Sequence, residues 1–167
     1  VSKKFKTDSK MYLISAIYNE MTVRDDFQLL ITADQPKDQD DKTNYLIIDK
    51  KKNTIATIIL NTYKTSSLYG VMTHKCSKGL SALIEAYITN TSLSPGEYLF
   101  GDKPLTAFVT TNNKKMGIKG SISNFRHMKI TDQLSNQNIT AAERVELATK
   151  MGHSPNTQLA YMRQHKL

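Results

Sequence analysis

An Ile- and Thr-rich stretch in the middle of the chain constrains the fold most, because it lies between regions with helical periodicity. Residues 45–49 (YLIID) and 54–60 (TIATIIL) flank a polar KKKN turn, a pattern typical of a β-hairpin. Residues 61–67 (NTYKTSS) predict a second turn, and residues 68–74 (LYGVMTH) predict a third short strand. We therefore expect an α+β fold, mostly helical, with a small three-stranded antiparallel sheet.

Apolar residues recur at helical spacing on both sides of this stretch. Helices are expected over residues 10–21, 77–88, 121–134 and 138–152, with another beginning at Thr22 and a last one after Ser154. Thr140 and Glu143 have the spacing of a capping box, and Gly152 suits the left-handed position that ends a helix. Ser154 and Pro155 are typical of the cap and first residue of a helix. Local sequence signals therefore predict where the C-terminal helices begin and end.

The composition is that of one globular domain: 167 residues, 39% hydrophobic and 23% charged. No apolar run reaches the roughly 20 residues of a membrane span, and the first residues do not resemble a signal peptide. The one cysteine, Cys76, permits neither an internal disulfide nor a Cys-rich zinc site, which is typical of an intracellular, reducing compartment. Because the chain lacks an initiator Met, we expect it to be a fragment.

The net charge of +8 predicts a polyanionic partner. Most of this charge comes from lysine, the usual solubilising cation. A planar guanidinium is better suited to bidentate contacts with phosphate. The chain has only four arginines: Arg24, Arg126, Arg144 and Arg163.

Four segments carry basic, imidazole and phenol groups in a distinctive order. They are VRDDFQLLI (23–31), NTYKTSSLYG (61–70), FRHMKIT (125–131) and ATKMGHSPNTQLAY (148–161). From about Lys10 to Gln164 the chain resembles the catalytic domain of the tyrosine recombinases, the phage-integrase family. The first two segments resemble the viral or mobile-element branch, including virophage-like integrases.

The resemblance implies DNA strand cleavage and joining through a 3′-phosphotyrosyl intermediate, without a metal or cofactor at the site. Such chemistry needs cations around the phosphate, a proton for the leaving oxygen and a phenol as nucleophile. The implied roles are a phosphate clamp for Arg24 and Arg126, general acid for Lys64, a phosphate contact for His153 and nucleophile for Tyr161. Double-stranded DNA is the expected partner, with a tetramer on DNA and a monomer or weak oligomer when free.

Each of these residues also has an ordinary structural role open to it. Arg24 could pair with a surface acid, Lys64 could be solvated, His153 could bond helix-end carbonyls and Tyr161 could fill a core. Their shared order on the expected elements favours the catalytic interpretation. Arg144 and Arg163 lack this context and are interpreted as surface or DNA-backbone residues. His127 lies about 100° round the helix from Arg126, so a packing or second-shell role is expected.

The chain departs from the family pattern in two places. Ser123 stands where the family commonly has a histidine; it can hydrogen-bond a phosphate oxygen or the phenol but cannot accept a proton at neutral pH. Our hypothesis is that His153 or water deprotonates Tyr161, with Ser123 orienting. Residues 135–138 (SNQN) are expected to be a loop insertion.

Two other functions remain open from the residues alone. A type IB topoisomerase uses much the same set of groups to nick and relax one duplex. A DNA-binding module could retain the fold and have lost the chemistry. The resemblance also implies that an N-terminal DNA-binding domain is absent from this chain.

Overall fold

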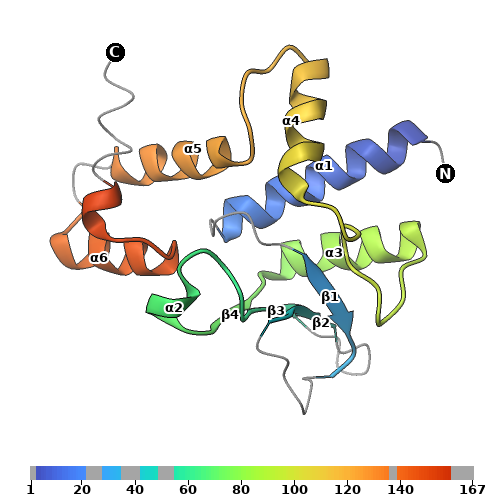
Figure 1. Cartoon of the computed structure of the whole chain (residues 1–167), viewed down its shortest axis with the longest axis horizontal. Helices are drawn as coiled ribbons and strands as arrows, with labels where there is room; N and C mark the ends of the chain where they lie inside the picture. The colour runs from blue at the N-terminus through green and yellow to red at the C-terminus, as the bar shows by residue number, and fades with distance from the viewer. Residues whose placement is uncertain (1–2, 22–27, 35–41, 49–54, 136–138, 159–167) are drawn as a thin grey trace.

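The computed structural model in Figure 1 describes residues 3–21, 28–34, 42–48, 55–135 and 139–158. Its elements are α1 (Lys3–Glu20), β1 (Leu29–Thr32), β2 (Asn44–Ile47), β3 (Thr57–Leu60), α2 (Ser66–Tyr69), β4 (Met72–Lys75), α3 (Lys78–Thr91), α4 (Leu105–Lys115), α5 (Ser123–Leu134) and α6 (Ala141–Lys150). Residues 155–158 are also helical. The fold is α+β, as expected.

The described strands form a four-stranded mixed sheet in the order β1-β2-β3-β4. The predicted antiparallel pairing is confirmed, because β2 and β3 pair antiparallel with Tyr45 opposite Ile59. The KKKN turn predicted between them lies outside the described residues. The third predicted strand also pairs antiparallel, but it begins at Met72, because residues 66–69 form the short helix α2. The sequence-based sheet was therefore right in its antiparallel part and one strand too small.

The missing strand is β1, which runs parallel to β2. A helix was predicted to begin at Thr22 and no strand was predicted before residue 45, so β1 was missed; residues 22–27 themselves lie outside the described residues. Its buried residues alternate with half-buried ones, and its backbone also bonds the segment after α3: Ile31 N–H donates to the Glu97 carbonyl at 3.0 Å. A four-residue apolar run is too short for periodicity to separate helix from strand, so these tertiary bonds decide its structure.

Helices α1 and α3 pack against each other beside the sheet (Figure 1). Their inward faces supply Ile14, Ile17 and Ile84, which are fully buried. β3 adds Ile58 and Leu60 to the same core. Burying an aliphatic side chain of this size stabilises the fold by about 1.5–3 kcal/mol. The core thus lies between the helices and one face of the sheet.

A smaller apolar cluster joins α5 and α6 through Ile130, Leu134 and Met151. α6 begins with the predicted capping box, in which Thr140 and Glu143 each bond the other's backbone N–H. The Ser154 cap is also confirmed, since its Oγ accepts from the Thr157 N–H at 3.3 Å. Among the described residues, no helix has both the length and the apolar composition needed to cross a lipid bilayer.

Candidate functional site

The predicted site residues differ in how far the structure describes them. Arg24 and Tyr161 lie outside the described residues. Arg126 lies on α5, where the backbone is described and its side chain is not. Lys64 and His153 are described, in the turn after β3 and directly after the end of α6. The geometry of this pair can therefore be compared with the prediction.

His153 follows a tight helix ending that the sequence predicted at Gly152. Gly152 has φ of 64°, its N–H donates to the Thr149 carbonyl at 2.9 Å, and the His153 N–H donates to the Ala148 carbonyl at 3.0 Å. This pair of bonds is the Schellman motif, which requires a left-handed residue at the Gly152 position. His153 is only 8% exposed. The motif holds the His153 backbone in a fixed position relative to α6.

The turn that carries Lys64 is held by buried amides. The Asn44 Oδ1 accepts from the N–H groups of Asn61 and Thr62, each at 2.9 Å, and the Asn61 Nδ2 donates to the Thr43 carbonyl at 2.7 Å. Asn44 and Asn61 are both buried. Buried polar groups that are satisfied in this way give a loop one defined conformation. The exposed Lys64 thus projects from an ordered turn.

Tyr63 adds a further anchor to this turn. Its hydroxyl donates to the Gly70 carbonyl at 2.9 Å. Burial, with a contribution from Tyr69, raises the pKa of Tyr63 above its ordinary value. The hydroxyl therefore stays protonated and remains a donor at physiological pH. This bond joins the start of the turn to the residue that ends α2.

The turn after β3 and the end of α6 meet directly. The Thr65 hydroxyl donates to the Gly152 carbonyl at 2.7 Å, across 87 residues of sequence. Lys64 is the residue before this donor, and His153 is the residue after this acceptor. Figure 1 shows the loop leading to α2 beside α6. The structure therefore brings together the segments that carry the predicted general acid and the predicted phosphate contact.

The α5 helix is anchored at its own start. Phe125 stacks on Tyr18 of α1, with ring centroids 5.7 Å apart. Position 126 lies one helical turn before Ile130, whose side chain packs in the same cluster as Met151. Because Met151 lies two residues before His153, α5 runs next to the end of α6. His127 is half-buried, and the exposed Ser123 shares a 2.8 Å hydrogen bond with Ser121.

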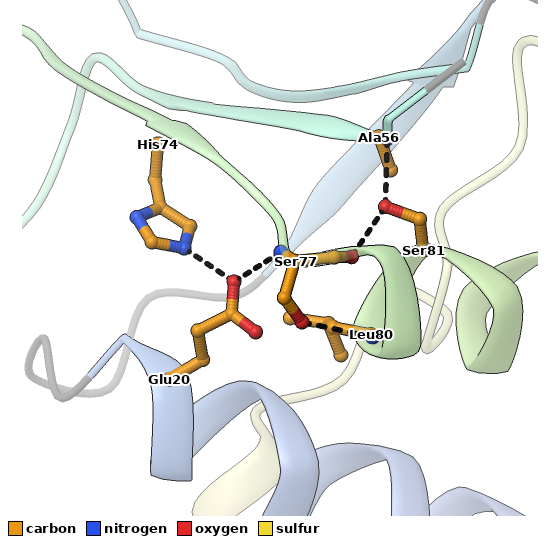
Figure 2. A network of polar contacts seen from close by, with 6 residues as sticks. All are labelled: Glu20, Ala56, His74, Ser77, Leu80 and Ser81. Carbon is orange, nitrogen blue, oxygen red and sulfur yellow. Dashed lines mark hydrogen bonds and ion pairs between the residues drawn. The ribbon is translucent and has the colours of Figure 1, made fainter.

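A second polar cluster lies at the other end of the sheet (Figure 2). The Glu20 Oε1 lies 2.9 Å from His74 Nε2 and accepts from the Ser77 N–H at 2.6 Å. Burial opposes ionisation of Glu20, but the hydrogen bonds from Ser77 and His74 outweigh it and lower the pKa of the carboxyl. Burial, and then the charge of Glu20, raises the pKa of the nearby Cys76 thiol to about 12. Because Glu20 lies 54 or more residues from His74 and Ser77, no local sequence pattern indicates this cluster.

The close contact between Gly152 and the Lys64 turn predicts that a side chain at position 152 destabilises the fold. A Cβ on Gly152 would meet Thr65 Oγ1 at 3.0 Å and Tyr63 Cε2 at 3.4 Å. Gly117 ends α4 with a similar φ of 71° and has nothing within 4 Å of its Cβ position. Gly117→Ala should cost about 1–2 kcal/mol from the backbone alone, whereas Gly152→Ala should cost about 2–4 kcal/mol. Urea unfolding measures both.

The comparison of the two variants separates backbone strain from displacement of the turn. Thr65→Val removes the hydroxyl with little change of shape. The free energy of unfolding that this substitution costs should be smaller in the Gly152→Ala background than in the wild type. If Gly117→Ala and Gly152→Ala lost equal free energy of unfolding, the turn would not hinder a Cβ at position 152.

No protein-family model, curated protein or solved structure matches this chain. Sequence reasoning missed Thr65 and Tyr63, which connect the Lys64 turn to its surroundings. A threonine in a turn carries no signal of a bond to a carbonyl so far along the chain.

Proposed function

We propose that this chain is the catalytic domain of a site-specific DNA recombinase or integrase of the tyrosine type. The observation that carries the proposal is the Thr65–Gly152 hydrogen bond, which draws the Lys64 turn to the helix end before His153. No interaction between near neighbours in the sequence can bring these two segments together. The recombinase chemistry requires both of their functional groups around one phosphate.

In the proposed reaction the Tyr161 oxygen bonds to phosphorus while the bond from phosphorus to the 5′ oxygen breaks. A phenol has an ordinary pKa of about 10 and needs a base, for which His153 or water would serve. Arg24 and Arg126 would bind the negative charge that develops on the phosphorane oxygens. Lys64 would donate a proton to the 5′ oxygen, and His153 would donate a hydrogen bond to the phosphate.

The products would be a 3′-phosphotyrosyl link and a free 5′-hydroxyl. The link conserves the energy of the broken ester, so a 5′-hydroxyl from another strand can reverse the reaction and join to it. Exchange between two duplexes would need several protomers, and we propose a tetramer on DNA. The excess of lysine supports double-stranded DNA as the partner. The single cysteine, Cys76, supports a reducing compartment and therefore an intracellular site of action.

A nicked suicide substrate tests the proposal. A pool of duplexes with randomised sequence carries a nick just 3′ of each candidate cleavage position, so the short cleaved strand diffuses away and religation fails. Wild-type protein should become linked to DNA in a band that survives denaturation, and sequencing that DNA would identify the target site. DNA that is retained in a native gel without a denaturation-resistant band would instead support a DNA-binding module.

The same preparation separates a recombinase from a topoisomerase. A topoisomerase relaxes a supercoiled plasmid as a monomer, with no dependence on a particular site. A recombinase should instead exchange strands between two duplexes that carry the recovered site. Relaxation without exchange would favour the topoisomerase.

Ser123→Ala tests the orienting role given to Ser123. The side chain is exposed at the first residue of α5, so the variant should fold normally. Loss of one hydrogen bond to phosphate or phenol should slow cleavage by about tenfold, the equivalent of about 1–1.5 kcal/mol. Single-turnover cleavage rates measure the effect, and Ser94→Ala at an exposed loop position serves as control. An unchanged rate would exclude the orienting role.

A further inference from the structure

Three side chains of different chemistry converge at the end of α1. They are Glu20, the last residue of α1; His74 on β4; and Cys76, directly after β4. One oxygen, one nitrogen and one sulfur atom from them all lie within 4.8 Å of one another. A carboxylate, an imidazole and a thiolate are the ligand types that zinc takes in proteins. We propose that Glu20, His74 and Cys76 bind a zinc ion that ties the end of α1 to β4.

The spacing of these atoms suits a tetrahedral ion. With bond lengths of about 2.0–2.3 Å, neighbouring ligand atoms around zinc lie about 3.3–3.6 Å apart. His74 Nε2 and Glu20 Oε1 are 2.9 Å apart, and Cys76 Sγ lies within 4.8 Å of one imidazole nitrogen of His74 and one carboxylate oxygen of Glu20. Side-chain shifts on the order of 1 Å would bring the three atoms to coordination distance. The His74–Glu20 hydrogen bond would then be replaced by two bonds to the metal.

The backbone around the three ligands is already ordered. The Ser77 N–H holds the Glu20 carboxylate, and the Ser77 hydroxyl caps α3 by accepting from the Leu80 N–H at 3.1 Å (Figure 2). The Cys76 N–H donates to the Ala56 carbonyl, and the Ser81 hydroxyl accepts from the Ala56 N–H at 3.0 Å. A hydrogen bond that orients a ligating carboxylate strengthens metal binding.

The partial exposure of two of the three side chains leaves a route for the ion. Cys76 is buried, whereas the side chains of His74 and Glu20 remain 28% and 24% exposed. Zinc would enter from the exposed side and keep a water as its fourth ligand. The thiol would release its proton to solvent on binding. Thiolate and imidazole ligands favour zinc over magnesium, which prefers oxygen. A one-thiolate site of this kind does not need the several cysteines of a zinc finger.

The test uses chelator-treated whole chain, titrated with zinc sulfate in a calorimeter. The expected result is one zinc per chain with a dissociation constant in the micromolar range or tighter, and a higher melting temperature with zinc than without. Cobalt chloride should give a thiolate-to-cobalt charge-transfer band and the visible bands of a tetrahedral ion. Magnesium chloride in large excess should not displace zinc.

Variants assign the ligands. Cys76→Ser and His74→Gln should each weaken zinc binding at least about a hundredfold, and Cys76→Ser should also remove the charge-transfer band. Glu85→Gln, an exposed carboxylate on α3, should bind as the wild type does. Circular dichroism of the metal-free variants confirms that they fold. Absence of stoichiometric binding to the wild type, or unchanged binding by folded Cys76→Ser or His74→Gln, would overturn the proposal. Neither outcome depends on DNA cleavage.

Discussion

Tyr161→Phe is expected to abolish covalent trapping on the nicked substrate while DNA binding stays within about twofold of wild type. The substitution removes one oxygen atom, which is the proposed nucleophile, and no neighbouring water can form a covalent protein–DNA link in its place. A denaturing gel measures trapping, and a native gel at the same salt concentration measures binding. The expected result is loss of the covalent band and retention of the shifted band.

Tyr12→Phe is the matched control, because Tyr12 is 64% exposed on α1. It should be trapped as fully as wild type. A covalent band that persists with Tyr161→Phe would contradict the assignment. Mass spectrometry of the linked peptide would then identify the true nucleophile.

Lys64→Ala is expected to slow strand cleavage by about 10²–10⁴-fold, because the 5′ oxygen is a poor leaving group without a proton. Lys64 is exposed in a turn held by Asn44, Asn61 and Tyr63, so its loss should leave the turn in place. Lys64→Arg keeps the positive charge but donates a proton poorly, because the guanidinium pKa is above about 12. It should therefore be slow as well. Single-turnover rates with saturating protein measure cleavage for each variant.

A change of leaving group tests the proton transfer itself. When sulfur replaces the bridging 5′ oxygen, the leaving thiolate needs no proton, because a thiol has a pKa of about 8.5. Lys64→Ala should then cleave at close to the wild-type rate. Lys119→Ala, an exposed lysine before α5, controls for general loss of charge and should be normal with both substrates. If sulfur left the Lys64→Ala defect unchanged, Lys64 would be a phosphate contact and another group would be the acid.

Features that depend on neighbouring residues could be predicted from the sequence. The antiparallel β2–β3 pairing, the Thr140–Glu143 capping box and the left-handed Gly152 all appear where they were expected. Each is formed by groups within a few residues of one another, so the amino-acid pattern contains both partners. The same holds for the Ser154 cap.

Features that depend on distant residues were missed. Residues 29–32 form a strand because β2 and the segment at 96–99 provide hydrogen-bond partners for their backbone groups. The apolar run itself is compatible with a helix, so the neighbouring backbone groups that can hydrogen-bond with it decide that it forms a strand. For the candidate site, the order of Lys64 and His153 suggested a shared role, but only the fold supplies Thr65 as the link to Gly152.

The sequence by itself determined the β2–β3 pairing, the helix caps of the C-terminal helices and the candidate site residues, because caps, short hairpins and side-chain chemistry involve near neighbours. The tertiary structure decided which of these elements meet. It joined the turn after β3 to the end of α6, and it gathered Glu20, His74 and Cys76 at the end of α1. Such meetings depend on how the helices and sheet pack around a common core, and no local pattern contains that information.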